Sequence, residues 1–351
     1  MRSTSAVAPT SDGVGPFGGS ARSLLATLGL AAAFFVGAPA APIDAQQTTE
    51  TWRAPRTPWG DPDLQGTWTN VTATPLERPR DLAGQPVLTE EERADRFHQF
   101  TQETSTDAAP PAGSTGSHNE YWRERGVLLE RTSLLVDPPD GRLPPLTPEA
   151  RATRVRLSAA RRTGPADGPE SRDLFERCVT RGLPGTMMGN FYNHNYEILQ
   201  TPDHVVIVAE MIHDARIVPL DGRPHVDRRI GQWPGDSRGR WEDDTLVVET
   251  TNLRAVDRTT ISRGLGVITL GTSTAARVVE RFTRRGPEAI DYEVTVDDPA
   301  VYAAPWTAAV PMTTREGPLF EFACHEGNYG LGGILAGHRA EERAAAAADR
   351  P

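Results

Sequence analysis

The segment Thr245–Thr251 (TLVVETT) and residues 204–211 (HVVIVAEM) decide the fold of this chain. Both are rich in valine, isoleucine and threonine, the residues that favour β-strands. Similar segments recur between Tyr192 and His325, and turn pairs such as Asp243-Asp244 lie between or beside them. This alternation predicts a β-domain. Its expected strands are residues 196–201, 204–211, 245–251, 276–283, 291–296 and 319–325.

The connections between these strands are too short for helical crossovers, so the strands are expected to run antiparallel. Strands at this spacing are typical of a barrel or a sandwich. Gly66-Thr67-Trp68 resembles the Gly-x-Trp of the first lipocalin strand. We therefore expect a mainly β protein, an antiparallel meander that forms a calycin-like barrel, with a sandwich as the alternative.

The rest of the chain divides into three parts. Residues 1–45 are interpreted as a signal peptide, and residues 46–190 as a Pro/Gly-rich irregular arm with short helices. The β-domain covers residues 191–333, and an Ala-rich helix and tail follow it at residues 334–351. A capping box at Thr89 predicts a helix over 90–101. Thr147 before Pro148 predicts a second helix that ends near residue 162. Ser171 is expected to cap a short helix that carries Cys178.

The signal peptide is indicated by arginines 2 and 22 ahead of an apolar run at 24–38, which is too short to span a bilayer. Cleavage is expected after Ala40 or Ala45, which leaves a secreted or periplasmic protein with no stable membrane insertion. Such a compartment favours pairing of the two cysteines, Cys178 and Cys324.

Charge and composition exclude several functions. The formal net charge is -10 and no basic run is present, so nucleic acid is not an expected partner. All 37 basic residues are arginines, which excludes Schiff-base chemistry, pyridoxal phosphate attachment and a P-loop lysine. No cofactor is expected.

Several motifs resemble a family of secreted proteins from soil bacteria for which no activity is established. The resemblance implies membership and export, and it implies no mechanism. It rests on residues 57–66 (TPWGDPDLQG), 211–216 (MIHDAR), 221–225 (DGRPH), 235–237 (GDS), 241–250 (WEDDTLVVET), 280–282 (ERF) and 324–329 (CHEGNY).

Glu210, His213 and Arg216 form the main candidate site. Strand alternation places Glu210 and Arg216 on one face and His213 on the other. A break in the strand at Ile212-His213 would bring them together as a base, an orienting group and an anion clamp. Without a break, Glu210 and Arg216 form an ion pair, and His213 is a core histidine. Arg216 is expected to meet Glu210, Glu280 or an anionic ligand.

Other polar residues interrupt apolar strand faces or end strands. Glu280 and Glu249 lie within strands, and a buried carboxylate needs a partner or a raised pKa. His225 and His325 stand near carboxylates, but the histidine spacing matches no compact metal motif, so no metal is predicted. Residues 235–239 match G-x-S-x-G without the strand-turn-helix context of a nucleophile, and Asp236-Ser237 reads as a turn.

We expect an exported protein that holds a small, partly apolar molecule in a polar-lined barrel. The leading hypothesis is a cofactor-independent acid–base enzyme, a lyase, isomerase or hydrolase, with His213, Glu210 and Glu280 as catalytic residues. The expected substrate-binding residues are Arg216, His225, His325 and Glu249. The alternatives are a non-catalytic ligand-binding protein of lipocalin type and a structural envelope protein.

Overall fold

The computed structural model describes residues 52–105, 120–163, 167–172, 174–189, 192–255 and 271–348, all of them in one compact unit. The predicted signal peptide lies outside the described residues. Within these ranges, no helix combines the length and the apolar character needed to cross a membrane.

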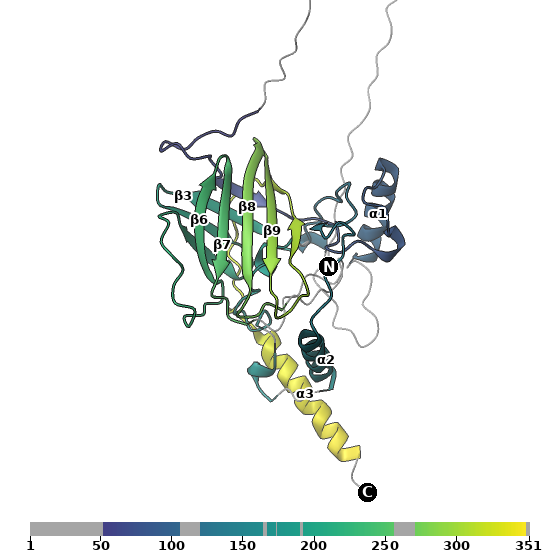
Figure 1. Ribbon diagram of the computed structural model, residues 1–351. Helices are drawn as coiled ribbons and strands as arrows, with labels where there is room; N and C mark the ends of the chain where they lie inside the picture. Colours follow the sequence, from purple (N-terminus) through teal and green to yellow (C-terminus); the bar gives the residue numbers. More distant parts are fainter. Residues whose placement is uncertain are drawn as a thin grey trace, which may run out of the picture. The chain divides into compact units, whose positions relative to one another are not determined.

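The described part of the chain is mainly β, and nine of its strands form a nearly closed antiparallel barrel (Figure 1). Around the barrel they follow the order β5, β4, β3, β1, β11, β9, β8, β7 and β6. The prediction of an antiparallel barrel is confirmed. The strands are β1 (Gly66–Thr69), β3 (Asn195–Gln200), β4 (His204–Ala209), β5 (Ala215–Pro219), β6 (Asp236–Glu242), β7 (Thr245–Thr251), β8 (Arg277–Gly286), β9 (Ala289–Asp297) and β11 (Met312–Thr314).

Two meanders, β3-β4-β5 and β6-β7-β8-β9, make up most of the barrel, and β1 and β11 join them. The predicted turns connect the hairpins: Pro202-Asp203 follows β3, and Asp243-Asp244 separates β6 from β7. Asp243 has a φ of 53°, a left-handed conformation that aspartate tolerates better than most residues. Local turn chemistry therefore explains the order within each meander.

Strand β9 has two partners on its far edge. β10 (Trp306–Ala309) pairs with one half of it and β11 with the other. Pro311 lies between β10 and β11, and because proline has no amide hydrogen it cannot continue a ladder. β10 also pairs with β2 (Leu135–Asp137), while β11 pairs with β1, so the sheet branches at this interruption.

The barrel closes between β5 and β6, a contact that we call the seam. Among the described strands, β5 pairs only with β4 and β6 only with β7. Gly239 of β6 lies against the other side of the seam, because a Cβ atom there would be 2.7 Å from Leu220 Cδ2 and 2.8 Å from Val218 Cγ1. The seam is thus held by side-chain packing, and glycine permits the close approach.

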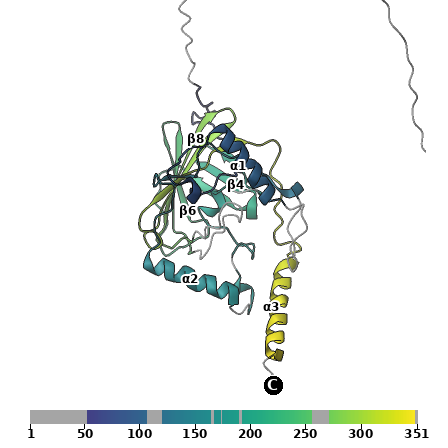
Figure 2. The same ribbon diagram turned by 90° about the vertical axis from the view of Figure 1, so that its right-hand side faces the viewer.

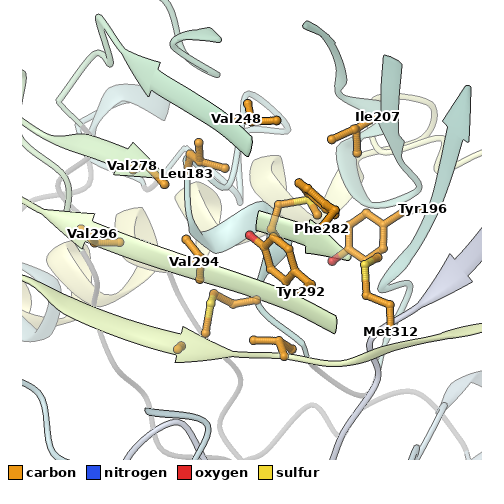
Figure 3. Packing of buried hydrophobic residues seen from close by; sticks show 14 of the residues in the cluster. Leu183, Tyr196, Ile207, Val248, Val278, Phe282, Tyr292, Val294, Val296 and Met312 are labelled. Atoms are coloured by element: carbon orange, nitrogen blue, oxygen red, sulfur yellow. The ribbon is translucent and has the colours of Figure 1, made fainter. Parts of the chain in front are cut away.

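Large side chains fill the centre of the barrel. Trp68, Tyr196, Phe282 and Tyr292 are each at most 1% exposed. Figure 3 shows the last three close together between the strands, and the Phe282 and Tyr292 ring centroids are 4.8 Å apart. Leu183, from outside the strands, joins the same cluster. Barrels of about this size can hold a small ligand. In this barrel side chains occupy the centre, so the ends and the outer surface leave more room for a ligand.

In the described part of the chain, three α-helices accompany the barrel (Figure 2). The capping box of α1 is present, since Thr89 Oγ1 accepts from the Glu92 amide and the Glu92 carboxylate accepts from the Thr89 amide. The predicted helices at 90–101 and 148–162 and the helical tail are confirmed. The helices are α1 (Glu90–Glu103), α2 (Pro148–Thr163) and α3 (Tyr329–Ala348), and the 3-10 turns are Arg80–Leu82, Glu120–Trp122, Pro169–Ser171, Gly185–Met187 and Met211–His213.

Three local predictions are wrong. Residues 319–325 form no strand: Phe320 is 65% exposed, so the segment has no buried apolar face to pair. Residues 174–178 are turns, and Cys178 has a φ of 57°, which a helix does not allow. Asp236 and Ser237 begin β6 and do not form a turn. The strand assignment leaves Ser237 buried, with Oγ 2.8 Å from Thr250 Oγ1.

The predicted disulfide between Cys178 and Cys324 is present, with Cα atoms 5.7 Å apart. Cys178 lies in a turn that precedes β3, and Cys324 lies in the segment that follows β11. The disulfide therefore joins the segments on either side of these strands. A disulfide of this kind is typical of an oxidising compartment.

Candidate functional site

Strand β4 ends in a strained turn at residues 210–214. Glu210 has helical dihedral angles, while Ile212 has a φ of 66° and His213 a φ of 47°. Left-handed backbone at a β-branched residue is a genuine outlier and costs on the order of 1–3 kcal/mol. The break at Ile212-His213 that the sequence left open is therefore present. It does not bring the three side chains of the predicted site into mutual contact.

Glu210 is 3% exposed and is held by two asparagines. Its Oε1 accepts from Asn193 Nδ2 at 2.9 Å, and its Oε2 accepts from Asn195 Nδ2 at 2.5 Å. The same Asn195 nitrogen also donates to Glu124 Oε1, at 3.1 Å. We call Glu124, Asn193, Asn195 and Glu210 the Glu210 cluster. Two carboxylates in it share a single amide group.

The Glu210 cluster has more acceptors than donors. The Oδ1 atoms of Asn193 and Asn195 are buried, and neither has a hydrogen-bond partner among the described residues. A buried acceptor without a partner costs about 1–3 kcal/mol. Arg315 Nε, 3.8 Å from Glu124 Oε1, gives the carboxylates partial compensation. The cluster is therefore suited to a molecule that donates hydrogen bonds, such as an alcohol or an amine.

His213 is exposed, and one of its ring nitrogens is fixed. Nδ1 lies 3.2 Å from the backbone oxygen of Phe322. A carbonyl oxygen only accepts, so Nδ1 carries the proton and the neutral ring has its lone pair on Nε2. Within the described part of the chain, Nε2 has no partner. The side chain is thus oriented as a general base that faces solvent.

Two aromatic residues lie near His213 and the Glu210 cluster. The rings of Tyr192 and Phe322 meet edge to face, with centroids 6.4 Å apart. Burial raises the pKa of Tyr192, and the nearby charge of Glu210 raises it further. The surroundings of Glu210 and His213 therefore combine carboxylates, an imidazole and apolar surface.

Arg216 and Glu280 meet inside the barrel, in a different place from His213. Arg216 Nη1 and Nη2 donate to Glu280 Oε2 and Oε1 at 2.6 and 2.9 Å, and Tyr292 Oη donates to Oε1 at 2.9 Å. The two charged side chains are 4% and 0% exposed. Burial alone lowers the pKa of Arg216, but the Glu280 carboxylate raises it above its ordinary value. Arg216 was expected to meet Glu210, Glu280 or an anionic ligand, and its partner in the structure is Glu280.

A buried histidine network lies beside this pair. Arg181 Nη1 is 2.6 Å from His194 Nε2, and His194 Nδ1 is 3.3 Å from Tyr196 Oη. Arginine only donates, so His194 accepts at Nε2 and donates from Nδ1, and Tyr196 donates its own hydrogen to Thr186 O at 2.9 Å. Burial, followed by the charge of Arg181, holds the pKa of His194 well below its ordinary value.

This network predicts acid destabilisation. The unfolded His194 gains a proton below about pH 6.5 while the folded one stays neutral, so stability falls as the pH falls. Between pH 7 and pH 5 the contribution of one such histidine is about 2 kcal/mol. Urea unfolding at pH 7 and pH 5 should show that the wild type loses about 2 kcal/mol more stability than His194→Gln does. The control His98→Gln, at an exposed position, should lose as much stability between the two pH values as the wild type does. Equal losses in the wild type and His194→Gln would contradict the assignment.

His225 and Glu249 come together on the outside of β6 and β7. His225 Nδ1 donates to Asp236 Oδ2 at 2.8 Å, and its Nε2 lies 3.6 Å from Glu249 Oε1. Arg277 also binds Glu249 and is the main cause of the lowered pKa of that carboxyl. The structure thus unites two of the predicted substrate-binding residues. No hydrogen bond or ion pair among the described residues joins them to the Glu210 cluster.

His325 follows the disulfide at Cys324 and is exposed. The ranges described above contain no group of three histidine, cysteine, aspartate or glutamate side chains that could hold a metal ion.

Sequence reasoning did not find Glu124, Asn193 or Asn195. Asn195 was within reach, because the turn at Pro202-Asp203 sets the register of the β3-β4 hairpin. That register pairs Tyr196 with Ala209 and places Asn195 next to Glu210. No signal in the sequence points to Glu124, which lies far away along the chain.

Comparisons with protein-family models, with curated proteins and with solved structures found no match.

Proposed function

We propose that the protein binds a small, partly apolar molecule beside Glu210 and His213, and that these two residues transfer protons to and from it. The observation that carries the proposal is the strained turn at residues 210–214. It separates a buried carboxylate from an exposed imidazole by only two residues. Backbone strain persists only where the surrounding structure enforces it, and it concentrates at functional sites.

The chemistry around the turn supports this role. The Glu210 cluster supplies carboxylates and unpartnered amide oxygens for a ligand that donates hydrogen bonds. His213 supplies an accessible Nε2 whose tautomer is set by Phe322 O. Tyr192 and Phe322, whose rings are in contact, supply apolar surface nearby. An acid–base reaction of the lyase, isomerase or hydrolase type needs these elements.

In this proposal Glu280 and Arg216 have a structural role. Their charges satisfy each other inside the barrel, and His213 lies outside it. The Glu210 cluster and His213 therefore form the site, in place of the wider set expected from the sequence. The second candidate function is a carrier that binds the same molecule without chemistry, which the packed environment of Glu210 also supports.

The test is a thermal-shift screen of small alcohols and amines with an aromatic or aliphatic body. The affinity of each compound found is then measured for Glu210→Gln and His213→Ala. For an enzyme, both variants should retain binding within about tenfold and lose at least about 100-fold in turnover, because a general acid–base group contributes at least that much. Product formation is followed by NMR.

The exposed His98, on α1, provides the matched control as His98→Ala, and it should change neither affinity nor turnover. Loss of affinity in both site variants, with no turnover in the wild type, would identify the carrier. Compounds that bind equally well to the wild type and to both variants would contradict the proposed site, and that result would favour a structural envelope protein.

We further propose that the protein is exported and works in a secreted or periplasmic location. The disulfide between Cys178 and Cys324 supports an oxidising compartment. Membership in the family of secreted proteins that its motifs resemble belongs to the same proposal.

A further inference from the structure

A cavity of about 430 Å³ lies outside the barrel, between α1 and two segments of the arm. Its volume is within the ordinary range of small-ligand sites, about 300–1,000 Å³. Much of the wall is apolar: Leu82 and Leu88 come from one arm segment, Leu128 from the other, and Phe100 from α1. None of its lining residues belongs to the Glu210 cluster.

Arg78 is the unusual member of the wall. The residue is only 8% exposed, yet its side chain bonds only to neutral oxygens within the described part of the chain. Nε donates to Thr132 Oγ1 at 2.9 Å and Nη1 to Asp140 O at 2.7 Å, while Nη2 reaches only Pro139 O, at 3.4 Å. Among the described residues, no carboxylate lies within ion-pair distance of this guanidinium. The positive charge is therefore buried without a compensating negative one, and Nη2 retains donor capacity.

Two other arginines of the wall are paired with carboxylates. Arg96 pairs with Asp81 at 2.7 Å, and Arg142 Nε is 3.5 Å from Glu77 Oε1. Glu103, also in the wall, accepts from Gln99 Nε2 at 2.6 Å. The two carboxylates of the wall, those of Glu77 and Glu103, disfavour a ligand with two negative charges. Glu103 has no arginine partner among the described residues, but it is exposed and therefore solvated. The buried guanidinium of Arg78 and the apolar walls favour a ligand with one negative charge and an apolar body.

We propose that this cavity is a second ligand site, which takes an apolar monocarboxylate and holds its carboxylate on Arg78. Nε and Nη1 are already bonded, so Nη2 donates to one carboxylate oxygen, and such charge-assisted hydrogen bonds are roughly twice as strong as neutral ones. The apolar body of the ligand lies against Phe100 and the leucines. The site does not depend on the function proposed for Glu210 and His213.

The probe is octanoate, and its binding to the full mature chain is measured by isothermal titration calorimetry. Octanamide has the same shape without the charge, and octyl phosphate has a second charge. We expect the wild type to bind octanoate at least about tenfold more tightly than octanamide, because octanamide cannot form a charge-assisted hydrogen bond with Arg78. Octyl phosphate should also bind more weakly than octanoate, because Glu77 and Glu103 repel its second negative charge. Arg78→Met should remove this preference, so that octanoate and octanamide bind alike.

Two further variants keep the test decisive. Gln99→Trp fills the cavity from an exposed position of α1 and leaves Arg78 in place, so it should abolish octanoate binding even if Arg78→Met does not fold. Arg229→Met removes an arginine whose side chain is 88% exposed, away from the cavity wall, and should bind octanoate as the wild type does. Unchanged octanoate affinity in Gln99→Trp, or equal affinity of the wild type for octanoate and octanamide, would overturn the proposal. Glu210→Gln should leave octanoate binding intact, so failure here is separate from failure of the proposed function.

Discussion

Replacement of Arg216 by methionine is expected to lower the free energy of unfolding by about 3–5 kcal/mol, because it leaves the Glu280 carboxylate buried without its cation. Tyr292 would still donate one hydrogen bond to Glu280, but a single phenol does not neutralise a charge at 0% exposure. Urea unfolding of the purified variant at pH 7 measures the loss. Arg240→Met is the matched control, since its pair with Glu242 is solvent-exposed, and such pairs contribute about 0–1 kcal/mol.

The position of this ion pair adds to its effect. Arg216 is on β5 and Glu280 on β8, so the pair connects strands from the two sides of the seam, across the barrel interior. The seam lacks a backbone ladder, and the pair is one of the bonds that link its sides. The double variant Arg216→Met/Glu280→Gln should recover part of the loss, because it removes both charges. A single variant as stable as the wild type would show that the pair does not hold the barrel closed.

Removal of the disulfide is the second large effect. The bridge closes a sequence separation of 146 residues, for which the loop-entropy model gives a stabilisation of about 4–5 kcal/mol. The double variant Cys178→Ala/Cys324→Ala should lose up to this amount in urea unfolding, and a reducing agent should lower the stability of the wild type alone. Non-reducing peptide mapping of the protein isolated from its native host should recover the two cysteines in one linked peptide pair. Two free thiols, or a wild type that is indifferent to reduction, would contradict the assignment.

Local features were predictable where a short stretch of sequence contains its own cause. Thr245–Thr251 is a strand with the predicted bounds because its β-branched residues and the Asp243-Asp244 turn act within a few positions. The capping box at Thr89 and Glu92 predicted the start of α1 for the same reason. Residues 319–325 have a similar composition and form no strand, because composition does not provide a partner strand.

The candidate site was predictable only in part. The sequence left open whether the strand breaks at residues 212–213, whereas the burial of Arg216 next to apolar residues required a partner. Which carboxylate becomes that partner depends on how the barrel curls. Glu280 is 64 positions away, and the two side chains meet only because the strands close on each other.

By itself, the sequence determined the class of the fold as an antiparallel meander, the helices α1 and α2 of the arm and the pairing of the cysteines. These features follow from strand propensity, turn chemistry and helix capping, which act over a few residues, and from the presence of only two cysteines in the sequence. Only the tertiary structure decided that Asn195 joins Glu124 to Glu210 and that Gly239 lets the seam close. It also decided that Arg78 faces a cavity and has no acidic partner among the described residues. Each of these depends on contacts between segments far apart in the chain, and their positions are set by the packing of the whole barrel and arm.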